Sequence, residues 1–294
     1  MKILNFGSCN IDIVYSIDHI VKPGETLAAS GVETFVGGKG LNQTVALANA
    51  GVKVYHAGCI GQDGEMLKEF MSNAGADLKY LNTVDCKTGQ AVIQVDKNGE
   101  NAIFLYSGAN HAVTKEYTDK VISEFNEGDF LLLQNEINNI DYIIDAAFKK
   151  GMKIFLNPAP IDKKITQLDF NKIYCIIVNE TECFGYTGST NPEAFYDLIV
   201  QKYNNLSAVV TLGENGSVFI DKNGMYHQQA YSVKVVDTTA AGDTFVGFFV
   251  AELSRGVSPR EAIKTASAAA ALAVSRKGAA PSVPKLDEVF LIKD

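Results

Sequence analysis

A regular alternation of short apolar runs and helical stretches in the second half of the chain constrains the fold most strongly. Buried strands are expected at residues 130–134, 153–156, 173–178 and 208–212, with helices at 140–150 and 191–203. Parallel neighbouring strands need a crossover connection, and a helix usually supplies it. The alternation therefore predicts an α/β fold in which helices cover both faces of a mostly parallel sheet.

Polar groups follow several of the expected strands, and ligands of such sheets bind beyond the carboxyl ends of the strands. The groups are Asn10 and Asp12, Glu136, Asn157, Asn179 and Glu182, Thr211 and Gly213, and Asp243. Each of them has an ordinary alternative as a turn or cap residue; Asn179, for instance, would cap the next helix. Their shared location at one sheet edge favours a binding site.

Two earlier segments, residues 12–36 and 87–109, contain strand patterns without intervening helices. The second includes a hairpin that turns at Asp96-Lys97-Asn98-Gly99. Together they are expected to form a small β lid, while residues 1–11, 37–86 and 110–294 form the α/β core. A lid would exclude water from a site at this edge, and its exposed face favours a homodimer.

Local signals set several helix boundaries. Asp63 is expected to cap a helix that runs through residue 73, and Thr114 a helix that runs to about residue 125. Ser258-Pro259-Arg260-Glu261 has the pattern of a capping box, and it begins an alanine-rich helix that ends near Gly278.

Composition excludes several classes of function. The chain has 294 residues, 47% of them hydrophobic, which is enough for a large core. A net charge of −8 argues against nucleic-acid or anionic-membrane partners. Five scattered cysteines and four histidines without ligand spacing fit a reducing cytosol and disfavour a zinc site. No signal peptide or membrane-length apolar run is recognised, so a cytoplasmic location is expected.

The stretch from Val235 to Phe249 carries the clearest chemical signal. A β-branched run at residues 231–236 is expected to be a strand, and residues 245–253 an apolar helix. The small residues between them would leave N–H groups free at the helix N-terminus, where the helix dipole favours an anion. The carboxylate of Asp243 would complement that dipole, and this structural role alone could account for the residue. The functional alternative is phosphoryl transfer, with Asp243 accepting the proton of an alcohol.

A second glycine-rich motif, Gly37-Gly38-Lys39-Gly40-Leu41-Asn42-Gln43, precedes a helix that is expected to end near residue 50. Its spacing fits neither a Walker A loop nor a dinucleotide-binding fingerprint. It is either a tight strand–helix turn with a solvated Lys39, or the polar edge of a pocket.

With these motifs the chain resembles the ribokinase (PfkB) family of carbohydrate kinases over nearly its whole length. Residues 37–43 look like the family's sugar-side motif, and residues 237–245 look like its C-terminal motif. The resemblance implies a ribokinase-like three-layer αβα fold with a mostly parallel central sheet and a small β-sheet lid. It also implies ATP-dependent phosphorylation of a sugar's primary hydroxyl, with D-ribose to ribose 5-phosphate as the expected reaction.

The resemblance implies a role for each matching residue. Asp243 would be the catalytic base, beside an anion hole made by the N–H groups of Ala240, Ala241 and Gly242. The sugar would be held by Asn10, Asp12, Gly38, Lys39, Asn42, Glu136 and Asp243. ATP would lie against Asn179, Thr211, Gly213, Gly216, Ala241 and Gly242. Mg²⁺ would be organised through water by Asn179 and Glu182. K⁺ would be bound by Asp237, Thr239, Ala273, Arg276, Gly278 and Ser282, several of them through carbonyl oxygens.

Some alternatives stay open. Asn135, Val246 and Ser267 depart from residues that are usual in the family, so the sugar is less firmly indicated than the chemistry. Deoxyribose, a different sugar or a nucleoside are alternative acceptors. The alternative from another class is a non-catalytic sugar or nucleotide sensor, and Asp243 beside an intact Ala-Ala-Gly turn argues against it.

Overall fold

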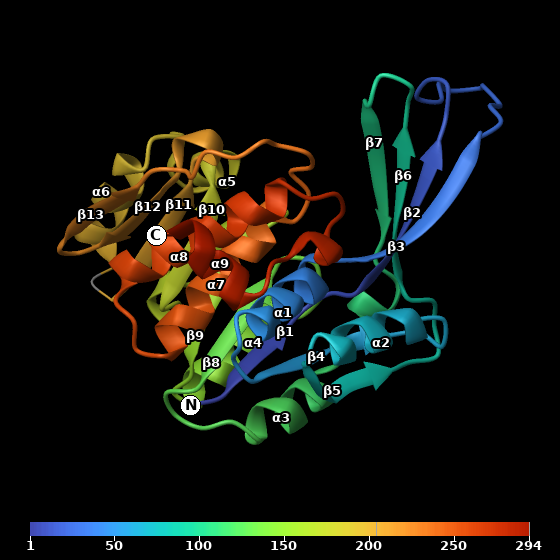
Figure 1. Cartoon of the computed structure of the whole chain (residues 1–294). Helices are drawn as coiled ribbons and strands as arrows, with labels where there is room; N and C mark the ends of the chain where they lie inside the picture. Colours follow the sequence, from blue (N-terminus) through green and yellow to red (C-terminus); the bar gives the residue numbers. More distant parts are fainter. Residues whose placement is uncertain (204, 294) are drawn as a thin grey trace.

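The structure is a computed structural model that describes residues 1–203 and 205–293. Its central sheet is made of β1 (Ile3–Phe6), β4 (Val54–Ile60), β5 (Asp77–Thr83), β8 (Phe130–Gln134), β9 (Lys153–Asn157), β10 (Cys175–Asn179), β11 (Ser207–Thr211), β12 (Ser217–Asp221) and β13 (Gly224–Gln228). The order across the sheet is β13-β12-β11-β10-β9-β8-β1-β4-β5 (Figure 1). Among the described residues of this central sheet, only the β11–β12 and β12–β13 pairs are antiparallel. The expected mostly parallel sheet is confirmed.

Helices cover both faces of this sheet. One face carries α1 (Lys39–Asn49), α2 (Glu65–Asn73), α7 (Ala241–Ser254), α8 (Pro259–Val274) and α9 (Leu286–Lys293). The other carries α3 (Lys115–Ser123), α4 (Ile140–Lys149), α5 (Glu180–Thr187) and α6 (Glu193–Lys202). Short 3₁₀ turns lie at Gly108–His111, Ile165–Gln167, Phe170–Lys172, Gly213–Asn215 and Ala280–Ser282. The three layers of the expected αβα fold are therefore present.

Each central strand supplies side chains to two hydrophobic cores. In β8, Leu132 packs into the α1–α7 core, whereas its neighbours Leu131 and Leu133 pack into the α3–α6 core. In β10, Ile177 likewise packs into the α1–α7 core and Val178 into the α3–α6 core. Because side chains alternate along a strand, a strand covered on both faces is continuously apolar, which is the pattern read from the sequence.

The lid is a separate four-stranded sheet that stands away from the central sheet (Figure 1). Its strands are β2 (Asn10–Ser16), β3 (Gly31–Gly37), β6 (Gly89–Val95) and β7 (Asn101–Tyr106), in the order β3-β2-β6-β7. The expected hairpin joins β6 to β7, and Gly99 N donates to Asp96 O at 3.0 Å in its turn.

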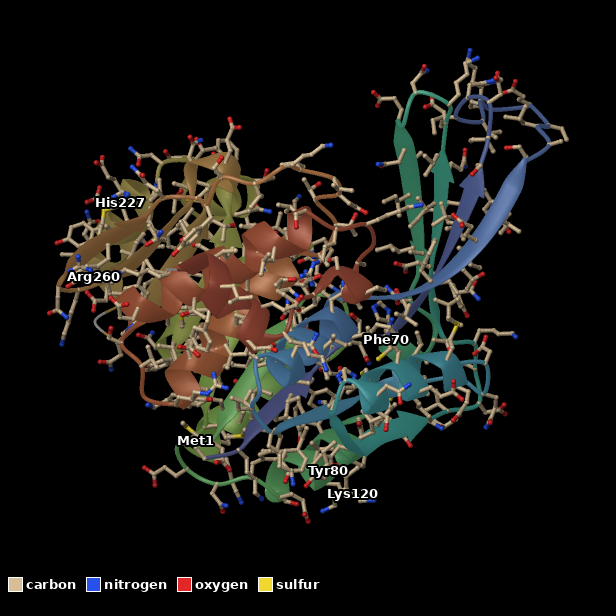
Figure 2. The ribbon with its side chains drawn as sticks, viewed as in Figure 1. Met1, Phe70, Tyr80, Lys120, His227 and Arg260 are labelled. Carbon is tan, nitrogen blue, oxygen red and sulfur yellow. The ribbon has the colours of Figure 1, made fainter. Side chains whose placement is uncertain are left out.

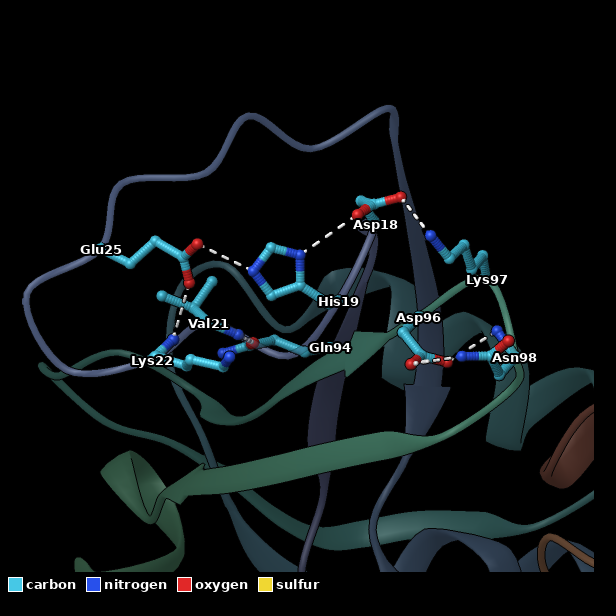
Figure 3. A network of polar contacts seen from close by, with 9 residues as sticks. All are labelled: Asp18, His19, Val21, Lys22, Glu25, Gln94, Asp96, Lys97 and Asn98. Carbon is cyan, nitrogen blue, oxygen red and sulfur yellow. Dashed lines mark hydrogen bonds and ion pairs between the residues drawn. The ribbon is translucent and has the colours of Figure 1, made fainter.

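A network of exposed charges ties the outer loop of the lid together (Figure 3). The ring of His19 lies between Asp18 and Glu25, with Nδ1 and Nε2 at 3.2 and 2.8 Å from their carboxylate oxygens. Lys97 in the β6–β7 turn reaches Asp18 at 3.0 Å. The pKa of His19 is raised by its hydrogen bonds to Asp18 and Glu25. The network links the loop after β2 to the neighbouring hairpin.

Two local expectations were wrong. Residues 231–236 are not a strand: the N–H groups of Val236 and Asp237 both donate to Val274 O, at 2.8 and 3.2 Å. Asp63 does not cap α2, which begins after Gly64 without a side-chain cap. Its Oδ1 instead accepts from Thr88 N and Oγ1 at 2.9 and 2.7 Å.

Strand β5 was not anticipated, because its sequence DLKYLNT is half-buried and mixes polar with apolar residues at the sheet edge. Tyr80 of this strand and Lys120 of α3 lie at one end of the molecule, and His227 and Arg260 at the opposite end (Figure 2). No helix in the described ranges is long and apolar enough to span a bilayer.

Candidate active site

The carboxyl ends of the parallel strands bring the expected polar residues to one edge of the central sheet. Ser8 and Asn10 follow β1, Glu136 follows β8, and Asn157, Asn179 and Thr211 end β9, β10 and β11. The N-termini of α1 and α7 reach the same edge, as the contacts of Lys39 and Asp243 show. The structure therefore places these polar residues at one edge of the sheet, as expected from the sequence.

Asp243 lies in the first turn of α7 and is 6% exposed. Its Oδ2 accepts from Asn42 Nδ2 and its Oδ1 accepts from Gln43 Nε2, both at 2.9 Å. Two amide donors from α1 therefore hold one carboxylate at the start of α7. A buried carboxylate held at a fixed orientation is suited to accept a proton from a bound hydroxyl group.

The turn before Asp243 has an unusual backbone. Ala240 adopts φ 58°, and no side chain caps the helix that follows. Ala241 N makes only a long hydrogen bond, 3.3 Å to Thr238 O, and a Cβ on Gly242 would meet nothing within 4 Å. This N-terminus faces open space, as an anion-binding turn requires.

A pocket of about 720 Å³ adjoins that turn. Its lining includes the expected nucleotide residues Thr211, Gly213, Gly216, Ala241 and Gly242. Further walls are formed by mostly apolar residues, together with Ser267: Tyr231, Val235, Phe245, Ala270, Ala271 and Val274. A largely apolar pocket that ends at a helix N-terminus fits a nucleotide, with a flat base on the apolar side and phosphates at the turn.

On the other side of Asp243 lies a group of polar side chains from the lid and the core. Oδ1 of Asp12 and Oδ1 of Asn42 are buried without a hydrogen-bond partner among the described residues. Asn10 is 6% exposed, and its Oδ1 accepts from Asn110 Nδ2 at 2.7 Å. A buried acceptor without a donor costs about 1–3 kcal/mol, so these atoms call for a ligand rich in hydroxyl groups.

Burial and the charge of Glu136 raise the pKa of Asp12 to about 7. Burial also raises the pKa of Glu136, against the hydrogen bonds that its Oε2 accepts from Ser8 Oγ and Lys39 N at 2.5 and 2.9 Å. A second cavity, of about 130 Å³, is lined by Asn10 and Glu136 together with Tyr106, His111 and Asn135.

Lys39 provides a positive charge among these carboxylates. The pKa of Lys39 is raised chiefly by Asp243 and further by Glu136 and Glu182, against the opposing effect of burial. The ammonium group is therefore positively charged at neutral pH in the middle of the site. It is not the solvated surface charge that was the structural alternative.

The glycines around Lys39 allow this close packing. A Cβ on Gly37 would lie 2.0 Å from Asp12 Oδ2, so glycine leaves room for that carboxylate. Gly38 adopts φ 91°, a conformation that favours glycine, and it lies against the backbone of Cys9 and Asn10.

Asn179 and Glu182 form a complete capping box at the start of α5. Asn179 Oδ1 accepts from Glu182 N at 2.8 Å, and Glu182 Oε2 accepts from Asn179 N at 3.0 Å. Burial raises the pKa of Glu182. The ordinary role as a cap is therefore real, and any bound Mg²⁺ would have to share this carboxylate through water.

The residues expected around K⁺ lie in the segment before α7, in the last turn of α8 and in the segment after α8, and Asp237 joins the first of these to the last. Its Oδ1 accepts from Thr239 N and its Oδ2 from Gly278 N, both at 2.9 Å. Burial would raise the pKa of Asp237, but these hydrogen bonds hold it below its ordinary value. Arg276 directs its side chain to Glu288 at 2.6 Å, which leaves its carbonyl as the possible ligand. Ser282 donates to Ala279 O, and Ala273 O accepts from Arg276 N.

Gln43 and Asn157 are site residues to which the sequence assigned no role. Gln43 Nε2 donates to Asn157 Oδ1 at 3.0 Å as well as to Asp243. Gln43 lies in the glycine-rich motif at residues 37–43, and Asn157 is one of the polar groups expected at the sheet edge, but no local pattern shows that the two meet.

The comparisons with known proteins show which family the chain belongs to. Residues 1–286 match the family model described as pfkB family carbohydrate kinase. A ribokinase of Haemophilus influenzae is 37% identical over 299 residues, covering 97% of this chain and 95% of that protein. A deoxyribokinase of Salmonella typhi is 30% identical over 301 residues, covering 98% and 97%.

Solved structures give the same result. A ribokinase of Thermotoga maritima matches with a TM-score of 0.87 and 35% identity, covering 99% of each chain. A ribokinase of Arabidopsis thaliana, solved with ribose and ATP, matches with a TM-score of 0.86 and 29% identity, covering 100% of this chain and 98% of that one.

Proposed function

Because the chain belongs to the pfkB family of carbohydrate kinases, we propose that it transfers the γ-phosphoryl group of ATP to the primary hydroxyl of D-ribose. The name of the Haemophilus influenzae relative and the ribose and ATP of the Arabidopsis thaliana structure support this acceptor and this donor. The product would be ribose 5-phosphate. 2-Deoxyribose is the second candidate acceptor, since a deoxyribokinase is also among the relatives.

One observation carries the proposal: Asp243 lies between a pocket that fits a nucleotide and a group of unpartnered polar atoms. The 720 Å³ pocket reaches Ala241 and Gly242 on one side. On the other side, Asp12 Oδ1 and Asn42 Oδ1 are buried acceptors without a donor, and the hydroxyl groups of a sugar would supply one. A base at that position takes the proton of a hydroxyl that attacks the terminal phosphate.

In this mechanism the chain itself mainly positions and stabilises charge. Asn10, Asp12, Lys39, Asn42, Glu136 and the backbone at Gly38 would bind the sugar. The N–H groups of Ala240, Ala241 and Gly242 would donate hydrogen bonds to the transferred phosphoryl group and stabilise the negative charge that develops on it. Asp243 contributes on the order of 10²–10⁴-fold as a general base, so positioning must supply most of the remaining rate.

Two cations belong to the proposal. Mg²⁺ would be organised through water by Glu182 and Asn179 and would neutralise phosphate charge. K⁺ would be held by the carboxylate and carbonyl oxygens of Asp237, Thr239, Ala273, Arg276, Gly278 and Ser282. Oxygen donors alone suit such a hard monovalent cation, and the Asp237–Gly278 hydrogen bond that joins the segments before α7 and after α8 supports the site.

We also propose that two copies of the chain pair through their lids. Ile103, Phe104 and Leu105 of the edge strand β7 are 55%, 58% and 54% exposed. An unpaired edge strand with exposed apolar residues usually marks an interface. A second copy of the lid has the same apolar surface, so it is the partner whose chemistry fits.

The test is ADP release by the purified chain with Mg²⁺ and ATP, offered D-ribose, 2-deoxyribose, fructose and nucleosides, with K⁺ or Na⁺. Ribose-dependent turnover that K⁺ increases supports the acceptor and the cation. A preference for another acceptor would replace ribose and keep the mechanism. Binding of ATP without turnover on any acceptor would favour the sensor alternative.

A further inference from the structure

We infer that Gln43 is a positioning residue for the phosphoryl transfer: its side-chain amide, held by the buried amides of Gln134 and Asn157, fixes the Asp243 carboxylate. The inference deepens the proposed function and rests on Asp243 being the base. Gln43 is 0% exposed, and both hydrogens of its amide are used by Asn157 and Asp243, so it has no donor left for the sugar or the nucleotide. Any effect on the reaction must pass through a residue that it contacts.

A continuous chain of hydrogen bonds leads to Gln43 from the strands of the central sheet. Asn5 of β1 donates to Gly40 O and Thr44 Oγ1 at 2.7 and 2.8 Å. Its Oδ1 accepts from Gln134 Nε2 of β8 at 2.8 Å. Gln134 Nε2 also donates to Gln43 Oε1 at 2.6 Å.

Asn157 of β9 determines which end of the Gln43 amide faces the site. Asn157 Nδ2 donates to Ile177 O of β10 at 2.9 Å, so its Oδ1 must be the acceptor toward Gln43. A flipped Gln43 would place Oε1 against Asn157 Oδ1 and Asp243 Oδ1, with three acceptors in contact and no donor. Only one orientation of the Gln43 amide places a donor against both of these acceptors, and in it Nε2 points at Asp243 Oδ1.

The network gives Asp243 a fixed pair of supports. Gln43 Nε2 holds Oδ1 and Asn42 Nδ2 holds Oδ2, each at 2.9 Å. Asn42 also has an unpartnered Oδ1, which fits a role in contact with sugar, whereas the Gln43 amide is fully used inside the protein. Four adjacent strands, β1, β8, β9 and β10, thereby set the direction of one catalytic carboxylate. A misplaced reacting group loses on the order of 10²-fold in rate.

The experiment compares Gln43→Leu, which removes both the donor and the acceptor at similar size, with the unsubstituted chain on its best acceptor. We expect kcat to fall roughly 10–100-fold while KM for the acceptor and for ATP stays within about threefold. Thr118→Val is the matched control, because Thr118 in α3 is also 0% exposed and polar but lies outside this network. It should leave kcat unchanged.

A double-mutant cycle separates positioning from general damage. If Gln43 acts only through Asp243, Gln43→Leu should change the residual single-turnover rate of Asp243→Asn by no more than about twofold. Equal losses in both backgrounds would overturn the inference, and so would a kcat loss below about twofold in the native background.

A crystal structure of Gln43→Leu gives a readout that does not need activity. The inference expects the Asp243 carboxylate to rotate or to occupy several orientations while α1 and α7 stay in place. An unmoved, singly ordered carboxylate would contradict it. Lack of turnover by the unsubstituted chain on every acceptor would instead count against the proposed function, and the crystallographic result would still decide the positioning.

Discussion

Gly247 of α7 lies directly against Ala46 of α1: a Cβ on Gly247 would sit 2.3 Å from Ala46 Cβ. This contact sets how closely the two helices approach, and therefore whether Asn42 and Gln43 of α1 reach Asp243 of α7. Gly247→Ala should lower the free energy of unfolding by about 1–2 kcal/mol, because overpacking outweighs the gain in helix propensity. Displacement of α7 should also lower kcat about tenfold or more.

Urea unfolding and steady-state kinetics check this prediction. Gly185→Ala in α5 is the matched control, since the closest atom to its Cβ would be Cδ1 at the flexible end of the Ile161 side chain, at 2.2 Å. Adding Ala46→Gly to Gly247→Ala should restore part of both losses by returning the space. A fully active and stable Gly247→Ala protein would show that the helices do not need this approach.

The raised pKa of Asp12 makes a prediction about stability and pH. The folded chain keeps a proton on Asp12 up to about pH 7, whereas the unfolded chain releases it near pH 4. The contribution of this carboxyl to stability is therefore complete in acid and is lost as the pH rises through about 7. Asp12→Asn should match the native stability near pH 4 and exceed it by roughly 1–3 kcal/mol above pH 8, while binding sugar about tenfold more weakly.

Urea unfolding of the ligand-free protein across this pH range is the measurement for Asp12. Asp85→Asn, at an exposed position, is the control and should show no such pH-dependent difference. A stability difference that is the same at every pH would mean that Asp12 is ionised throughout.

The proposed pairing of lids predicts a change in mass. Neighbouring residues of a strand face opposite sides, so Ile103→Lys combined with Phe104→Lys removes apolar surface from both faces of β7. The double variant should sediment as a monomer at concentrations where the native chain is a dimer. Phe148→Lys in α4, 48% exposed and outside the lid, should leave the mass unchanged. A monomeric native chain would refute the pairing.

The sequence predicted the central sheet well because doubly covered strands such as β8 and β10 consist of apolar residues throughout. It failed at the edges, where other forces decide. The polar strand β5 has no such signal. The β-branched residues Val235 and Val236 are exposed, and Val236 N donates to Val274 O at the end of α8 instead of to a strand. Asp63 is of a residue type that often caps helices, but its carboxylate accepts hydrogen bonds from Thr88, 25 residues further along the chain.

The candidate site divides in the same way. The shared edge follows from the fold class, so Asn10, Glu136 and Asp243 could be expected to lie close together. The contact of Gln43 with Asn157 and Asp243 depends on the register of four strands and on the α1–α7 approach. Neither the register nor the approach of the two helices can be recognised from a local sequence pattern. The roles of individual residues stay predictions until they are measured.

The most direct test of the central claim is the turnover of Asp243→Asn with Mg²⁺, ATP and D-ribose, measured beside its affinity for ribose. If Asp243 is the general base, kcat should fall by about 10²–10⁴-fold while the Kd for ribose changes by no more than about threefold. Turnover within about tenfold of the native rate would contradict the assignment of the base.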